Sequence, residues 1–130
     1  MLRSFALLLA VYAGPAMAAE QQRSVPPRFQ GEWNASPKRC GTDMDDSRLT
    51  ITASRVRFYE SGGPIRAIVT QGSLDVALIS EVSGEGSTQL VYHHFRLSAD
   101  HAHLTDVSNG AALVRHRCVA VPRIPGARPT

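Results

Sequence analysis

The sequence predicts an all-β fold, an eight-stranded antiparallel meander that forms a small closed or nearly closed β-barrel with one disulfide. Apolar and polar residues alternate through residues 29–120, and no window of comparable length keeps a helical period. Turn sequences separate the alternating runs, and Asn109-Gly110 is the strongest short hairpin signal among them. The only two cysteines, Cys40 and Cys118, follow the first predicted strand and end the last one.

Residues 1–18 predict a secretory signal peptide. Arg3 precedes an apolar run from Phe5 to Ala13, and small residues surround the expected cleavage point near Ala18. The run is shorter than the roughly 20 residues that a helix needs to cross a bilayer. We therefore expect a periplasmic or secreted protein, a monomer without stable membrane insertion.

The rest of the chain divides into a disordered N-terminal linker at residues 19–28, the β-barrel domain at 29–120 and a disordered proline-rich tail at 121–130. Within the domain we expect strands at residues 30–34, 48–53, 55–60, 65–71, 73–82, 87–98, 101–107 and 111–119. The period-two pattern directs one set of side chains inward: Leu49, Ile51, Val56, Phe58, Ile65, Ala67, Val69, Leu74, Val76, Leu78 and Val82.

Such a meander forms either a closed barrel or a two-sheet sandwich. In an oxidising compartment a lone pair of cysteines is most simply a disulfide, which needs Cα atoms about 4.4–6.8 Å apart. Closing the barrel brings the first and last strands together, although a sandwich can do the same. A bridge between Cys40 and Cys118 encloses nearly the whole domain and is worth about 4 kcal/mol by loop entropy.

The segment FQGEW, Phe29 to Trp33, followed by a meander resembles the lipocalin and calycin group of small-ligand barrels. The resemblance implies that Trp33 packs at the closed end of the barrel under an arginine from the last strand, either Arg115 or Arg117. The alternative for Trp33 is an ordinary core aromatic residue. The chain as a whole also resembles small secreted proteins of proteobacteria.

We therefore expect a non-catalytic binding module. A small apolar ligand inside the barrel is the first hypothesis, and its lining residues would be Val56, Phe58, Val69, Val76 and Phe95. The alternative is a protein inhibitor of a secreted hydrolase, of the lysozyme- or protease-inhibitor type. Such an inhibitor would have a filled core and would act through an ordered protruding loop, for which residues 35–47 are the candidate.

Catalytic and calcium-binding signatures are not evident in the sequence. No serine lies in a G-x-S-x-G elbow, so we assign no catalytic residue. Asp43, Asp45 and Asp46 lack the glycine and distal glutamate of a calcium loop and predict an acidic turn. Without Arg3, 13 basic and 11 acidic residues remain, and this small excess does not favour nucleic acid.

One basic surface contains an aromatic residue. If Ser61–Pro64 is a four-residue connection, Phe58 faces Ala67 and Tyr59 faces Arg66. The outer face then presents Tyr59 with Arg55, Arg57 and Arg66. This face would suit an acidic partner or an anionic envelope polymer, and the alternative is a solvated sheet surface.

The histidines fall in the last three predicted strands. A two-residue turn at Asn109-Gly110 places His103 opposite His116. If Ala99-Asp100 turns the preceding hairpin, Phe95 faces Leu104 and His94 faces Thr105. His94, His103 and His116 would then share one face, where zinc accepts three imidazoles and a water. The alternative is a set of solvated histidines without any cofactor.

Overall fold

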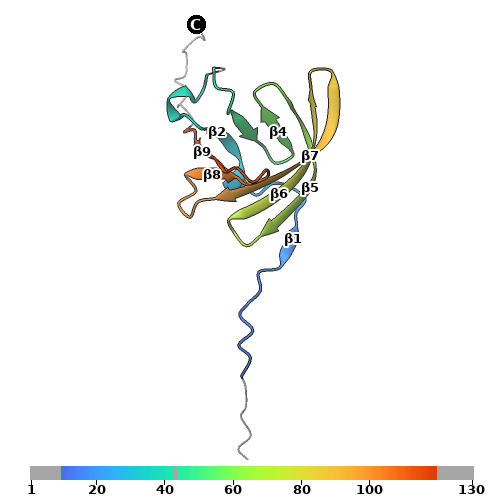
Figure 1. The fold of residues 1–130 in the computed structure, drawn as a ribbon, viewed down its shortest axis with the longest axis vertical. Helices are drawn as coiled ribbons and strands as arrows, with labels where there is room; N and C mark the ends of the chain where they lie inside the picture. Colours follow the sequence, from blue (N-terminus) through green and yellow to red (C-terminus); the bar gives the residue numbers. More distant parts are fainter. Residues whose placement is uncertain (1–9, 43, 120–130) are drawn as a thin grey trace, which may run out of the picture.

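The computed structural model describes residues 10–42 and 44–119, and there the chain forms a closed eight-stranded antiparallel barrel with one additional strand (Figure 1). The strands are β1 Ala19–Gln21, β2 Gly31–Asn34, β3 Leu49–Ile51, β4 Arg55–Phe58, β5 Gly62–Gln71, β6 Asp75–Gly84, β7 Ser87–Leu97, β8 His103–Asp106 and β9 Leu113–Arg117. Two 3-10 turns, η1 Pro27–Phe29 and η2 Pro37–Arg39, flank β2. The first half of the expected signal peptide and the expected tail at 121–130 lie outside the described residues.

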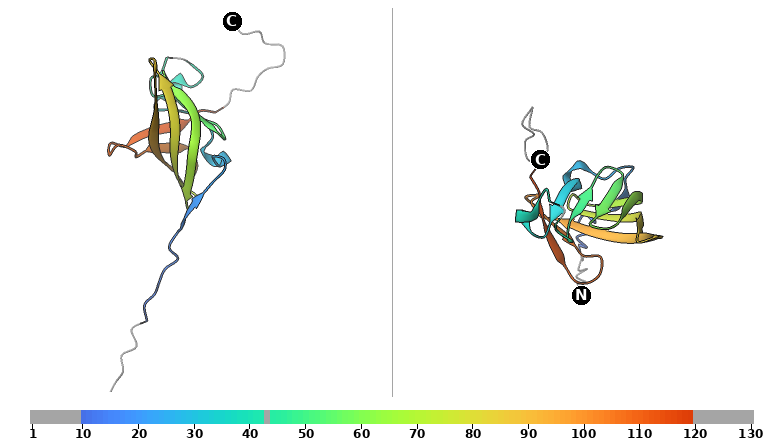
Figure 2. Two further views of the ribbon diagram at one scale, coloured as in Figure 1. Left: turned by 90° about the vertical axis from the view of Figure 1, so that its right-hand side faces the viewer. Right: turned by 90° about the horizontal axis from the view of Figure 1, so that it is seen from above.

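Each strand from β2 to β9 pairs with the next one along the chain, and β2 pairs with β9 to close the ring (Figure 2). Trp33 pairs with Arg117 and Asn34 with His116 across this closure. The barrel is therefore confirmed over the sandwich. The disulfide between Cys40 and Cys118 is also confirmed, with the two Cα atoms 5.5 Å apart.

Aliphatic and aromatic side chains fill the barrel. They come from β2, β3, β4, the second half of β5, β6, β7 and β8. The fully buried members of this core alternate with exposed residues, as a sheet with one face inside requires. They include Phe29, Trp33, Leu49, Ile51, Val56, Val76, Leu78, Phe95, Leu97 and Leu104. Among the described residues no helix is long and apolar enough to cross a membrane.

The predicted connection at Ser61–Pro64 is wrong. Arg57 pairs with Gly62 and the Phe58 N–H donates to the Ser61 carbonyl, so the turn is Tyr59-Glu60 and the glycines belong to β5. Tyr59 therefore does not face Arg66, and Phe58 does not face Ala67. Gly63 allows this approach, because a Cβ there would lie 1.7 Å from the Glu81 carbonyl oxygen.

A bulge in β5 corrects a second prediction. Ile65 pairs with Ser80 and Ala67 with Ile79, so Arg66 is an extra residue that inverts the alternation beyond it. Ile68 and Thr70 are consequently buried, whereas Val69 lies on the outer face and does not line the interior.

The N-terminal segment differs from the expected disordered linker at residues 19–28. β1 pairs antiparallel with β5, and the Val25 N–H donates to the Ala53 carbonyl. Val25 and Phe29 are fully buried, because this segment crosses the end of the barrel where Trp33 lies. The sequence pattern did not predict this packing, because the segment is rich in proline and polar residues and only two of its side chains enter the core.

Candidate functional site

The closed end of the barrel is built on Trp33 and Arg117. The Arg117 guanidinium carbon lies 4.1 Å from the centroid of the fully buried Trp33 ring. Arg117 Nη1 donates to the Gln30 carbonyl, Nη2 to the Arg28 carbonyl and Nε to the His101 carbonyl. Burial lowers the pKa of Arg117. One cation thus ties the N-terminal segment, the β7–β8 turn and the tryptophan together.

Gly31 explains the glycine of the Gly-x-Trp segment. Its φ is 130°, in a region that favours glycine, and a Cβ there would lie 3.3 Å from Arg117 Nη1. The Trp33 Nε1–H donates to the Phe29 carbonyl at 3.1 Å. Of the two candidate arginines, Arg117 is therefore the one that lies over the Trp33 ring.

Arg115 has a different position from Arg117. It is buried and lies nearer the opposite end of the barrel, where its Nε donates to the Ser47 carbonyl at 2.7 Å. Its Nη1 lies 3.7 Å from Asp106 Oδ2. Burial lowers the pKa of Arg115, and the Asp106 carboxylate partly opposes that shift.

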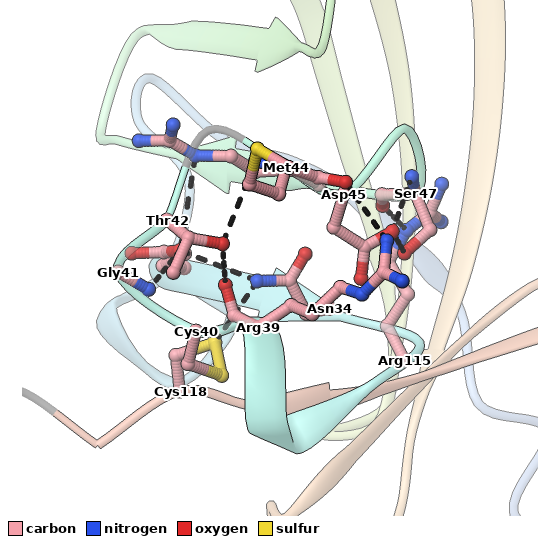
Figure 3. Close-up of polar contacts among 12 residues, drawn as sticks. Asn34, Arg39, Cys40, Gly41, Thr42, Met44, Asp45, Ser47, Arg115 and Cys118 are labelled. Atoms are coloured by element: carbon pink, nitrogen blue, oxygen red, sulfur yellow. Dashed lines mark hydrogen bonds and ion pairs between the residues drawn. A yellow bond between two sulfur atoms is a disulfide. The ribbon is translucent and has the colours of Figure 1, made fainter.

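The connection between β2 and β3, described at residues 35–42 and 44–48, contacts Arg115 and Cys118 of the last strand region (Figure 3). Cys40 is bonded to Cys118 at one side of the loop, and Arg115 holds Ser47 at the other. The loop also bonds to itself: Arg39 Nη1 donates to the Met44 carbonyl, and the Ala35 N–H donates to Ser47 Oγ. These four contacts hold the described residues of the loop, 35–42 and 44–47, against β9 and against one another.

Asp45 is the buried carboxylate of this loop. The hydroxyl and the backbone N–H of Ser47 both donate to Asp45 Oδ1, at 2.7 and 2.9 Å, and lower its pKa. Among the described residues, three buried side-chain polar atoms lack a hydrogen-bond partner: Asn34 Oδ1, Asp45 Oδ2 and Arg115 Nη1. The acidic turn expected at this position is therefore partly internal, with Asp45 as its structural member.

The outward side of the same loop presents a different set of residues. Pro37, Lys38 and Arg39 are exposed along η2, and the Met44 side chain is 75% exposed. Lys38 is the only lysine of the chain, and within the described residues its ammonium group has no ion pair. An apolar and a cationic side chain thus project from a fixed backbone.

Sequence reasoning missed a buried polar pair inside the barrel. Ser80 Oγ and His93 Nε2 lie 2.8 Å apart, and both residues are buried. The His93 ring packs between Phe58 and Phe95, and burial lowers its pKa. The period-two pattern contained the signal, because Ser80 is two residues from Leu78 and His93 two from Phe95.

The five candidate ligand-lining residues do not enclose a common space. Val56, Val76 and Phe95 belong to the packed core and Phe58 packs against it, while Val69 is outside. Three hollows on the described residues open at the surface. Val56 and Phe58 border one of these three, whereas Val76 and Phe95 border none of the three.

The histidine geometry is only partly as predicted. His103 pairs with His116, and the two ring centroids are 4.8 Å apart. The predicted β7–β8 register is wrong by two residues, since Leu97 pairs with Leu104 and Phe95 with Asp106. A two-residue shift keeps every side chain on its face.

His94 shares the outer face of the sheet with the other two histidines, but the shift places it farther along the strands from them. Its Nε2 lies 2.9 Å from Asp75 Oδ1, and its carbonyl accepts from the Val107 N–H. The turn is longer than predicted because Ser98 Oγ and Asp100 Oδ1 bond to backbone N–H groups within it. No group of three metal-ligating side chains is found in the described part of the chain.

The predicted basic surface is split. Arg55 and Arg57 are exposed on the outer face of β4, and both border a surface hollow. Arg66 lies outside that hollow at the β5 bulge, where its Nη2 and Nε both lie 2.8 Å from Glu81 Oε2.

No family model, no curated protein and no solved structure matches this chain. The lipocalin resemblance therefore stays a prediction.

Proposed function

We propose that this protein is a non-catalytic secreted or periplasmic binding module that inhibits a secreted hydrolase through the loop of residues 35–47. The observation that carries the proposal is the loop itself, whose backbone is fixed by Cys40–Cys118, by the Arg115–Ser47 bond and by Arg39. A loop held in one conformation loses little entropy on binding, which is how rigid inhibitors gain affinity. The disulfide also supports an oxidising compartment.

The exposed residues of the loop have the chemistry of a contact surface. The apolar Met44 side chain is 75% exposed, and Met is enriched at interfaces. The Lys38 ammonium group, which has no ion pair within the described residues, suits the catalytic carboxylates that lysozyme-type glycosidases use in pairs. The loop therefore offers one apolar and one cationic contact to such an active site.

The hypothesis of a small apolar ligand has less support. Val76 and Phe95 belong to the packed core, and Val56 and Phe58 border only a hollow that opens at the surface. A catalytic role also has less support, since the Ser80–His93 pair is buried away from any substrate. Native mass spectrometry of protein purified from its own periplasm tests the ligand hypothesis, because a co-purifying apolar molecule would restore it.

The inhibition proposal is tested with a c-type lysozyme, trypsin and subtilisin as probe enzymes. We expect the wild-type protein to inhibit at least one of them, and Met44→Asp and Lys38→Glu each to raise the inhibition constant about tenfold or more. Leu90→Asp is the matched control, because Leu90 is 68% exposed on β7, away from the loop. The proposal fails if none of the three enzymes is inhibited, or if L90D weakens inhibition as much as M44D.

The single lysine gives an independent measurement. Amine-directed labelling modifies only Lys38 and the N-terminal amine, because every other basic side chain except histidine is arginine. We expect the inhibited enzyme to protect Lys38 from labelling, and unchanged labelling in a saturated complex would place the contact elsewhere.

A further inference from the structure

A hollow of about 620 Å³ lies on the outer surface over β3, β4 and the start of β5, apart from the loop of residues 35–47. Its border includes Thr50, Arg55, Arg57, Tyr59, Ser61 and Ser83. A second hollow of about 360 Å³ shares Arg57 and Tyr59 with it. The larger volume falls within the ~300–1,000 Å³ typical of small-molecule sites.

The strand register creates this hollow. Arg57 lies between Thr50 on β3 and Gly62 on β5, and Arg55 pairs with Pro64. Short side chains therefore flank two long ones, so the surface is depressed on both sides of β4. Gly62 keeps β5 close, because a Cβ there would lie 2.8 Å from the Val56 carbonyl oxygen.

The two arginines of the hollow have no ion-pair partner among the described residues. Thr50 and Gly62, which lie opposite Arg57, carry no charge, and Pro64 opposite Arg55 carries none. Glu60 is the one carboxylate on the border, and it belongs to the exposed Tyr59-Glu60 turn. The Arg66 guanidinium, by contrast, is held by Glu81.

We propose that this hollow binds an anionic saccharide, a short sugar chain or sugar that carries carboxylate or phosphate groups. Arg55 and Arg57 supply planar donor pairs that match a carboxylate or a phosphate. The hydroxyls of Thr50, Ser61 and Ser83 match the hydroxyls of a sugar. The Tyr59 ring, 48% exposed, offers an apolar face against which a sugar ring packs.

A saccharide fits this surface better than an acidic peptide does. β3 pairs with β2 and β4, and β4 pairs with β3 and β5. A peptide therefore finds no free strand edge here, and strand addition is the main way in which an extended peptide gains affinity on a sheet. The hollow presents side-chain donors and hydroxyls instead.

The proposal is tested by isothermal titration calorimetry with trigalacturonate and glucose 6-phosphate as probes. We expect binding of at least one probe in the millimolar range or tighter. Arg55→Gln/Arg57→Gln should weaken it about tenfold or more, since both charged contacts are lost. Arg66→Gln is the matched control and should change affinity less than about twofold, because Arg66 lies outside the hollow. Tyr59→Ser should weaken the binding of the sugar probes without changing the thermal-unfolding midpoint of the protein.

The two sugar probes distinguish two classes of anionic saccharide. Binding of trigalacturonate alone assigns the carboxylated class, and binding of glucose 6-phosphate alone assigns the phosphorylated class. The saccharide assignment would be overturned if tetraglutamate or inorganic phosphate bound as tightly as the sugars, or if neither sugar bound. It would also be overturned if R66Q lost as much affinity for the sugars as the double variant of Arg55 and Arg57. Met44→Asp should leave sugar binding unchanged, which separates this proposal from inhibition through the loop.

Discussion

Arg115 and Arg117 lie two positions apart on β9 and have different contacts. Arg115 and Arg117 both point inward, and burial lowers the pKa of each. Arg117 meets an indole ring and three carbonyls, whereas Arg115 meets a carboxylate and the carbonyl of Ser47. Guanidinium groups remain charged even when buried, so each needs such partners to remain inside. One arginine closes the barrel and the other holds the loop.

His93 is the residue whose titration should set the acid stability of the fold. Its folded pKa lies below the unfolded value of 6.5, mainly because burial disfavours the imidazolium. The unfolded state therefore binds more protons over the interval between those two values, and the free energy of unfolding falls as pH drops below about 6.5. Asp106 opposes the pKa shift and Arg115 adds to it.

We expect His93→Gln to flatten the pH dependence of unfolding between about pH 7 and the folded pKa. Glutamine does not titrate and retains a polar atom for Ser80. Urea unfolding at a series of pH values measures the effect, with His116→Gln, on the outer face, as the control. A pH profile of H93Q that parallels the wild type would show that another group carries this dependence.

At the scale of elements, the sequence pattern predicted which segments form strands but not where their register changes. All eight predicted barrel strands occur, because alternation along a strand is a strong signal. The Arg66 bulge, the Tyr59-Glu60 turn and the Ser98–Ala102 turn were not predicted. The bulge and the first turn depend on contacts between strands, such as the close approach of Gly63 to Glu81, which a single strand's pattern does not contain. The Ser98–Ala102 turn depends on side-chain bonds to its own backbone.

The close approach of β5 to β6 at Gly63 should make this position sensitive to substitution. A Cβ at Gly63 would lie 1.7 Å from the backbone oxygen of Glu81, so β5 and β6 must separate to accept it. We expect Gly63→Ala to lower the free energy of unfolding by about 3 kcal/mol or more, from loss of strand pairing and core contacts.

The comparison is Gly110→Ala, because Gly110 has a φ of 77° and a Cβ added there would meet no atom within 4 Å beyond its chain neighbours. That variant should lose only about 1 kcal/mol from backbone strain. Chemical denaturation with circular dichroism measures both. A G63A protein whose stability matches or exceeds that of G110A would contradict the observed β5–β6 approach.

At the scale of the whole molecule, the barrel has two dissimilar ends. The N-terminal segment, Trp33 and Arg117 close one end, and the loop of residues 35–48 with Asp45 and Arg115 covers the other. The glycine and tryptophan of the first end lie in one local motif and could be singled out from the sequence, whereas the choice of Arg117 over Arg115 could not. The contact between Ser47 and Arg115 at the second end could not, because it joins a loop to a strand 68 positions away.

The closed end depends on a segment that precedes the barrel strands. Val25 and Phe29 are fully buried, the Phe29 carbonyl accepts from Trp33, and the Arg28 carbonyl accepts from Arg117. β1, in contrast, has three exposed residues. Removing β1 should therefore matter much less than removing the η1 segment behind it.

We compare chains that begin at Ala19, at Ser24 and at Gln30. The chain from Ser24 loses the β1 pairing and the two hydrogen bonds of Gln22 to β5, and it should be about 1–2 kcal/mol less stable than the chain from Ala19. The chain from Gln30 loses two buried side chains, at about 1.5–3 kcal/mol each, and leaves Trp33 Nε1 and Arg117 Nη2 without their acceptors. That sum approaches the whole stability of a small domain. We expect the chain from Gln30 to lose cooperative thermal unfolding, and a sharp transition at the wild-type midpoint would show that the barrel closes without this segment.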